Sequence, residues 1–137
     1  MTIKTNDYES VMQIMAKSSY HCDYSKQDIE DLIKPALHQG NYVLFKNSEG
    51  PYIFATWAFP EKAHIDEYIK TRKFPSPALY ADGPAPWIVE FIALEGPKSI
   101  IKGFRYLKDT FRDMGYIDCH WLRTETKKIG FHKLKEA

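Results

Sequence analysis

The sequence has few cysteines and no long apolar run. Cys22 and Cys119 lie near opposite ends of the 137-residue chain, and two cysteines cannot form the dense disulfide framework of a small secreted domain. The longest apolar stretches, residues 52–59 and 87–94, each contain a polar residue and are far shorter than the ~20 residues that cross a bilayer. The N-terminus has neither an apolar h-region nor a small-residue cleavage site. We therefore expect reduced thiols, no membrane span and a cytoplasmic location.

The composition is that of one ordinary globular domain. Hydrophobic residues make up 44% of the chain, charged residues 27% and aromatic residues 15%. A chain of this length can bury one core but not two, so we predict a single domain over residues 1–137. Charge is uneven, because residues 98–137 hold 10 Lys/Arg against 5 Asp/Glu, whereas residues 1–97 hold 9 against 13. The basic end predicts an acidic partner, such as nucleic acid, an acidic protein or a phosphate-bearing cofactor.

Local signals predict two helices followed by a hairpin. Apolar spacing indicates a helix over residues 6–17, and Ser25 with Asp28 resembles a capping box that opens a second helix. Pro35 should bend this second helix, and Gly40 should end it. The elements expected next are strands over residues 42–46 and 51–59 joined by a loop at 47–50, a short helix over 60–73 and an irregular loop over 75–86.

The remaining sequence predicts a strand, a helix and another strand. Residues 87–94 have the pattern of a buried strand, interrupted only by Glu90. A helix over 99–114 should stop at Gly115 and bury one apolar face, formed by Ile100, Ile101, Phe104, Leu107, Phe111 and Met114. A strand over 116–123 then completes a right-handed crossover between parallel neighbours. The expected order is ααββ(α)βαβ, which is an α/β fold with a mixed sheet.

Several short stretches point to a known family. They are Ser18-Ser19-Tyr20-His21, Lys34-Pro35-Ala36-Leu37, Tyr42-Val43-Leu44-Phe45, Ala55-Thr56-Trp57-Ala58, Asp82-Gly83, Trp87-Ile88-Val89-Glu90-Phe91-Ile92-Ala93 and Gly130-Phe131-His132. In order and spacing they resemble the RTX toxin-activating lysine acyltransferases of the hemolysin C type, over about residues 18–132. The resemblance implies a GNAT-like acyltransferase fold. It also implies transfer of a fatty acyl group from acyl carrier protein (ACP) to lysines of a protein, by a histidine and an acidic residue. His21 and Glu90 fall on those positions, and Glu90 stands where the family usually has aspartate.

The residues themselves leave the roles of His21 and Glu90 open. A lysine amine ordinarily has a pKa of about 10.4 and must lose a proton before it attacks a thioester, a task that suits a histidine base. His21 could instead be a surface or capping imidazole in the turn between two helices. An ionised Glu90 in an apolar strand needs a partner. Its partner could be His21, which Glu90 would orient or charge, or from which it would take up the proton relayed from the incoming lysine. It could instead form a structural ion pair with a lysine, or face solvent at a sheet edge.

The donor is predicted from the fold and from a missing loop. GNAT-type folds bind pantetheine beside the central strand, here residues 91–94 next to 117–121, where backbone amides could stabilise an oxyanion. Residues 94–99 lack the pyrophosphate loop of acetyltransferases, so we predict ACP-bound pantetheine thioester as the donor, acyl-CoA as the alternative, and no bound cofactor. The predicted donor-binding residues are Thr56, Trp57, Phe91, Ile92, Ala93, Gly96, Lys98, Ser99, Lys102 and Arg105.

A basic stripe along the 99–114 helix is either a solvated face or a docking surface for acidic ACP. It comprises Lys98, Lys102, Arg105, Lys108 and Arg112, and Lys127, Lys128, Lys133 and Lys135 extend the positive region. No nucleic-acid-binding motif accompanies these charges, so nucleic acid is not the predicted partner. Asp118 with His120, or His64 with Asp66, would supply two metal ligands each without a recognisable third, so we predict no metal.

Three functions are therefore considered. The first is a protein-lysine acyltransferase that uses ACP, the second an acetyl-CoA-dependent GNAT-type N-acetyltransferase, and the third a catalytically idle binding domain on the same fold. The partners expected for the first are ACP and a protein substrate acylated on lysine. A homodimer is left open.

Overall fold

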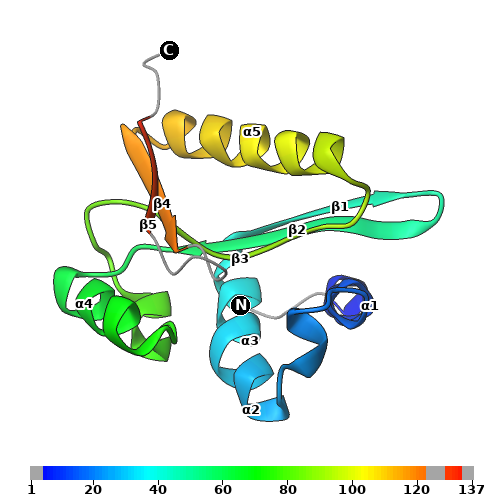
Figure 1. Cartoon of the computed structure of the whole chain (residues 1–137), viewed down its shortest axis with the longest axis horizontal. Helices are drawn as coiled ribbons and strands as arrows, with labels where there is room; N and C mark the ends of the chain where they lie inside the picture. The colour runs from blue at the N-terminus through cyan, green and yellow to red at the C-terminus, as the bar shows by residue number, and fades with distance from the viewer. Residues whose placement is uncertain (1–4, 123–128, 134–137) are drawn as a thin grey trace. The chain divides into compact units, whose positions relative to one another are not determined.

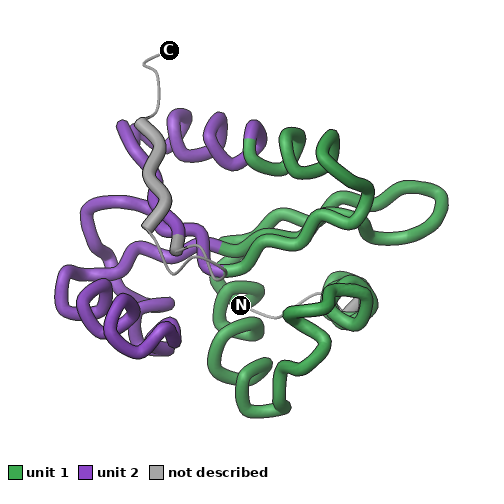
Figure 2. Tube along the Cα trace, in the orientation of Figure 1, with its two compact units in different colours: residues 1–56, 90–104 green, residues 57–89, 105–137 purple. Residues whose placement is uncertain are grey.

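The computed structural model of the protein describes residues 5–122 and 129–133 (Figure 1). The chain divides into two compact units, Met1–Thr56 with Glu90–Phe104 and Trp57–Val89 with Arg105–Ala137 (Figure 2). Each unit is built from separate stretches of sequence and is described by itself below. The single domain expected over residues 1–137 stays a prediction.

The strands of the described residues form a mixed five-stranded sheet in the order β1-β2-β3-β4-β5. β1 pairs antiparallel with β2, β3 parallel with β4, and β4 antiparallel with β5. The predicted α/β class and the parallel pairing across the crossover are confirmed. The elements are α1 (Thr5–Ala16), the 3-10 turn η1 (His21–Asp23), α2 (Lys26–Asp28), the π-helical segment η2 (Ile29–Ile33), α3 (Lys34–Gln39), β1 (Tyr42–Asn47), β2 (Gly50–Ala58), α4 (Lys62–Thr71), the 3-10 segment η3 (Ser76–Tyr80), β3 (Trp87–Ala93), α5 (Pro97–Asp113), β4 (Asp118–Leu122) and β5 (Ile129–Lys133).

Two of these elements were not expected. η3 lies inside the stretch predicted to be an irregular loop, and its proline occupies the first turn, where the missing N–H is tolerated. β5 was missed altogether, because it is short and contains Gly130, which weakens any strand signal. The Gly130-Phe131-His132 stretch therefore belongs to a strand that pairs with β4.

The first unit begins with helices whose ends follow from local chemistry. The capping box is confirmed, since Ser25 Oγ accepts from the Asp28 N–H and Asp28 accepts from the Ser25 N–H, each at 3.0 Å. Pro35 has no N–H to donate and its ring would clash with the carbonyl four residues earlier. The π-helical segment η2, whose turn is wider than that of an α-helix, ends just before α3, the helix that contains Pro35. The distortion expected from Pro35 is therefore a π-helical turn rather than a simple bend. Gly40 ends α3 in the left-handed conformation, at φ +73°.

The helices of the first unit pack on one face of the β1–β2 hairpin. Tyr42 pairs with Thr56 and Phe45 with Ile53 in the antiparallel ladder. In Figure 2, α1 to α3 lie on one side of the hairpin and the first turns of α5 lie on the other. The buried core on the helix side is formed by Val11, Ile14, Met15, Ile33, Leu37, Phe54 and Ile92.

The alternation of β3 decides which side chains face these helices. Ile92 belongs to the core beneath α1, so Glu90, two residues earlier, lies on the same face of the strand. Phe91 lies on the other face, where its ring is 5.6 Å from that of Phe104 in α5. Strand parity thus places one carboxylate on the face covered by the N-terminal helices.

The apolar face predicted for α5 is partly wrong. Leu107 and Phe111 are buried, but Ile100 is 49% exposed and Ile101 55% exposed, and Met114 is exposed as well. The reason is Gly103, which is buried and packs so closely that a Cβ there would lie 3.0 Å from the Phe91 ring and 3.2 Å from Ile53. A hydrophobicity pattern does not count glycine as an inward residue, so it assigns the wrong rotation to the helix.

The second unit contains several aromatic contacts. Trp57 meets Phe111 edge to face with ring centroids 5.5 Å apart, and Trp87 stacks on His120 at 5.1 Å. The parallel ladder pairs Trp87 with His120 and Ile88 with Trp121. Across the described residues of both units, none of the helices is long and apolar enough to cross a membrane.

Candidate active site

His21 and Glu90, predicted as a pair, lie together in the first unit. Nε2 of His21 is 3.4 Å from Oε1 of Glu90. His21 is in η1, where the chain turns between two helices, and Glu90 is on the helix-facing side of β3. Their exposed fractions are 7% and 4%, so neither a surface imidazole nor a solvent-facing edge carboxylate describes them. The pair is a buried histidine–carboxylate contact.

Ser18 fixes the other side of the imidazole. Its Oγ lies 2.8 Å from Nδ1 of His21 and accepts a hydrogen bond from the His21 backbone N–H at 3.3 Å. A hydroxyl that accepts from the backbone is free to donate its own proton to Nδ1. When the hydroxyl donates, Nδ1 is the acceptor and the proton of the neutral ring is on Nε2, which faces Glu90 at 3.4 Å without hydrogen-bond geometry. The serine, the histidine and the carboxylate form one polar chain.

Tyr24 holds the carboxylate from the opposite direction. Its hydroxyl lies 2.6 Å from Oε1 and 2.8 Å from Oε2 of Glu90. The backbone N–H of Glu90 donates to Oγ1 of the fully buried Thr56 at 3.2 Å. Hydrogen bonds to an ionised acceptor are about twice as strong as those between neutral groups, and they compensate for burial of the charge. The partners that Glu90 needs are His21 and Tyr24 rather than a lysine.

Aromatic rings enclose the imidazole. The His21 ring is 5.0 Å from the ring of Tyr20 and 5.1 Å from that of Tyr24. Burial raises the pKa of the Tyr20 phenol, the negative charge of Glu90 raises it further, and a hydrogen bond with Tyr24 lowers it. Tyr20 is therefore a neutral phenol at physiological pH.

Neither Ser18 nor Tyr24 was predicted to have a role in the site. Ser18 carries a local signal, since it stands three residues before His21 in a tight turn, where its hydroxyl can reach the ring. Tyr24 has no such signal, because its partner is far away in the sequence. The contact exists only after β3 has paired beneath the helices.

The arrangement is suited to proton transfer. Ser18 is partly exposed, whereas His21 and Glu90 are buried, so the serine is an accessible end of this chain; Tyr24 is partly exposed as well. A proton that arrives at Nδ1 would turn His21 into an imidazolium whose Nε2–H faces the carboxylate. A histidine base backed by a carboxylate is a recurrent device in acyl transfer.

Three predicted donor-binding residues lie in β3 beyond Glu90. Ile92 is part of the core beneath α1, and Phe91 packs on the α5 side. Ala93 is partly exposed and ends the strand. Of the predicted donor residues, Thr56 is the one joined directly to Glu90, through the hydrogen bond described above. Trp57 and Arg105 belong to the second unit, where Trp57 lies in the core and Arg105 is exposed.

The residues at the start of α5 are largely used internally. Ser99 is buried, donates to the Gly96 carbonyl at 2.8 Å and accepts from the Glu95 N–H at 3.2 Å. Gly96 adopts φ +82°, which favours glycine. Lys102 is exposed, but its Nζ donates to the Tyr52 hydroxyl and lies 5.0 Å from the Phe45 ring centre. Lys98 is exposed and, among the described residues, has no ion pair.

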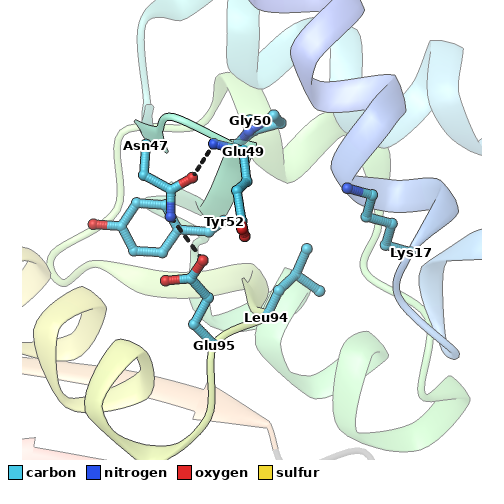
Figure 3. A pocket seen from close by; sticks show the side chains of 8 residues that line it. Lys17, Asn47, Glu49, Gly50, Tyr52, Leu94 and Glu95 are labelled. Carbon is cyan, nitrogen blue, oxygen red and sulfur yellow. Dashed lines mark hydrogen bonds between the residues drawn. The ribbon is translucent and has the colours of Figure 1, made fainter.

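An open pocket of about 210 Å³ lies at the hairpin loop of the first unit (Figure 3). Asn47 donates to Glu95 there at 2.7 Å and accepts from the Glu49 N–H at 2.9 Å. Neither His21 nor Glu90 lines it. The lining residues are Lys17, Asn47, Glu49, Gly50, Pro51, Tyr52, Leu94 and Glu95.

Within the ranges that the structure covers, no three His, Cys, Asp or Glu side chains gather in a way that could hold a metal ion. The pair Asp118 and His120, considered from the sequence, is 4.0 Å apart, and His120 is stacked on Trp87.

Comparison with known families defines the class of protein as an acyltransferase. The match is to HlyC, the RTX toxin acyltransferase family, and extends over residues 4–129 of the 137-residue chain. The chain belongs to this family, which confirms the resemblance on which His21 and Glu90 were selected. The family's toxin-activating activity indicates a protein substrate. No individual curated protein matches the chain.

Proposed function

We propose that the enzyme transfers a fatty acyl group from ACP to the amine of a lysine in a protein substrate. The observation that carries the proposal is the buried contact between His21 and Glu90, with Ser18 at its accessible end, in a chain of an acyltransferase family. The β3–α5–β4 crossover with parallel strands supports a GNAT-like form of the fold. Since acyl carrier proteins are cytoplasmic, the proposal includes a cytoplasmic location.

The proposed reaction begins with a lysine ammonium, which must lose a proton before it can attack. The Ser18 hydroxyl passes a proton to Nδ1 of His21 while it takes one from the amine. The neutral amine attacks the thioester carbonyl, the C–N bond forms and the C–S bond breaks. The thiolate of pantetheine leaves and takes the proton held by His21, which returns the imidazole to its neutral form, and the second proton lost by the amine goes to solvent. Glu90 stabilises the imidazolium throughout, because its carboxylate faces Nε2.

The donor proposal rests on the start of α5. This end of the helix exposes Lys98 together with the apolar side chains of Ile100 and Ile101. Exposed apolar residues beside positive charge suit a small acidic protein, because charge steers the encounter and apolar contact adds affinity. We propose that the backbone of Phe91, Ile92 and Ala93 contacts the pantetheine arm of the donor.

The test is a comparison of donors with an RTX protoxin fragment as acceptor. We expect palmitoyl-ACP to acylate the fragment on lysine, as detected by mass spectrometry, and to release pantetheine thiol at the same rate. Palmitoyl-CoA should be used less well, and acetyl-CoA should not be used. Faster transfer from acetyl-CoA than from palmitoyl-ACP would contradict the proposal and favour a GNAT-type N-acetyltransferase.

A further inference from the structure

Glu90 is held by one phenol at both carboxylate oxygens. The Tyr24 hydroxyl is 2.6 Å from Oε1 and 2.8 Å from Oε2, whereas Nε2 of His21 is 3.4 Å from Oε1. A phenol has one proton, so it is shared between the two oxygens or alternates between them. The closest contacts of the carboxylate are therefore to Tyr24 rather than to His21.

A glutamate in this place needs such an anchor more than an aspartate does. It has one more methylene and one more rotatable bond, so fixing a glutamate side chain in one conformation costs more rotamer entropy. The backbone of Glu90 is tied to Thr56 at 3.2 Å, but that bond leaves the side-chain torsions unrestrained. The Tyr24 hydroxyl is the group that selects one position of the carboxylate.

The ring of Tyr24 is itself fixed by its neighbours. It lies 5.1 Å from the His21 ring and 5.9 Å from the Tyr20 ring. Its backbone N–H donates to the His21 carbonyl at 3.1 Å, which closes the 3-10 turn. Tyr24, which holds Glu90, and His21, which faces Glu90, therefore belong to the same turn.

We propose that Tyr24 is a positioning residue, which holds the carboxylate of Glu90 beside Nε2 of His21. This inference rests on the proposed function, because it assigns Tyr24 a part in the same proton transfer. Tyr24 acts through Glu90 and does not itself touch the reacting atoms.

A double-mutant cycle tests the inference. Tyr24→Phe keeps the ring contacts and removes the hydroxyl; we expect kcat to fall about tenfold to a hundredfold with KM nearly unchanged, since misplacement of a catalytic group by about 1 Å has effects of that size. In a Glu90→Gln background the same change should lower kcat less than twofold further. Additive effects of the two substitutions would overturn the inference. If Tyr24 acts only through the Glu90 carboxylate, removing its hydroxyl should have little further effect once that carboxylate is gone.

Tyr42→Phe is the matched control. It also removes a phenol–carboxylate hydrogen bond in the first unit, from Tyr42 to Asp7 at 2.5 Å, but at a site without contact to His21 or Glu90 among the described interactions. We expect kcat of this variant to stay within twofold of the parent. An equal loss of kcat in both variants would show a general effect on the fold and would overturn the assignment of Tyr24.

A spectroscopic measurement separates this inference from the proposed function. In the full chain labelled with ¹⁵N-histidine, the Nε2–H signal of His21 should shift and broaden in Tyr24→Phe and stay unchanged in Tyr42→Phe. This result is expected even if the enzyme uses a different donor or acceptor. An unshifted signal in Tyr24→Phe would refute the positioning role, whereas a shifted signal together with an active His21→Ala variant would refute the proposed function alone.

Discussion

Nε2 of His21 and Oε1 of Glu90 are 3.4 Å apart in a buried site, although one residue lies in an N-terminal turn and the other in the third strand. Ser18 fixes the imidazole from one side and Tyr24 fixes the carboxylate from the other. The two groups are therefore oriented before substrate binds. Preorganised charge of this kind costs no reorganisation during the reaction.

His21→Ala should abolish acyl transfer while the protein stays folded. Loss of a general base lowers the rate by roughly 10²- to 10⁴-fold, and the small cavity should affect stability modestly. The measurement is acyl incorporation into the protoxin fragment, with thermal melting as the folding control. His38→Ala, at an exposed position, is the matched variant and should keep full activity. Activity of His21→Ala within a few fold of the parent would remove His21 from the mechanism.

Glu90→Gln should cut turnover severely, whereas Glu90→Asp should keep part of it. Glutamine keeps an acceptor for the Tyr24 hydroxyl but loses the charge that stabilises an imidazolium, so the fold should survive. A purely structural ion pair predicts instead that Glu90→Gln melts much earlier, since breaking such a pair costs about 3–5 kcal/mol. Turnover and melting temperature are measured on both variants. A Gln variant that melts early but turns over normally at low temperature would contradict a catalytic role.

Ser18→Ala should lower kcat more than it raises KM. The substitution removes the partner of Nδ1 and the link between His21 and the accessible side of the site. We expect transition-state stabilisation, measured from kcat/KM, to fall by about 1–3 kcal/mol, because that is the cost of leaving a buried polar group without its hydrogen bond. Intact-mass analysis of the enzyme after incubation with palmitoyl-ACP adds a second readout. An acyl adduct on Ser18 would show that the serine is a nucleophile rather than a relay.

Lys98→Glu should weaken binding of acyl-ACP and reduce the salt dependence of that binding. Lys98 is exposed at the start of α5, and rim charges act mainly on association. Lys102→Glu is a poorer probe, because it also breaks the contacts of Lys102 with Tyr52 and Phe45 and should lower the melting temperature. Lys62→Glu makes the same charge change at an exposed position in α4 and serves as the control. Equal affinity of the Lys98→Glu and Lys62→Glu variants, by titration at two salt concentrations, would mean that the stripe is only a solvated face.

The Tyr42–Asp7 bond should make stability depend on alkaline pH. Burial raises the pKa of Tyr42 from 10.0 to about 12, and the hydrogen bond to Asp7 adds to the shift. A pKa that is raised in the folded state gives stability that is complete below pH 10 and is lost as the pH rises toward 12. The difference in unfolding free energy between the parent and Tyr42→Phe, from urea titrations, should therefore shrink over this range. A difference that is constant with pH would contradict the role of this bond.

Elements with a local cause were predictable from the sequence. The Ser25–Asp28 capping box, the left-handed Gly40 and the hairpin loop each depend on a few adjacent residues, and the structure has them where they were expected. The rotation of α5 was not predictable in this way. It depends on how closely Gly103 of α5 approaches Phe91 of β3 and Ile53 of β2.

The sequence by itself determined the class of fold and the family, and it predicted His21 and Glu90 as a pair, because motif order and spacing can be read without coordinates. Only the tertiary structure decided what those two residues contact. Strand alternation turned Glu90 toward the helices, and packing of the η1 turn against β3 brought Tyr24 within 2.6 Å of its carboxylate. Contacts between residues so distant in sequence form only when burial of the surrounding core compensates for the entropy of closing the chain between them.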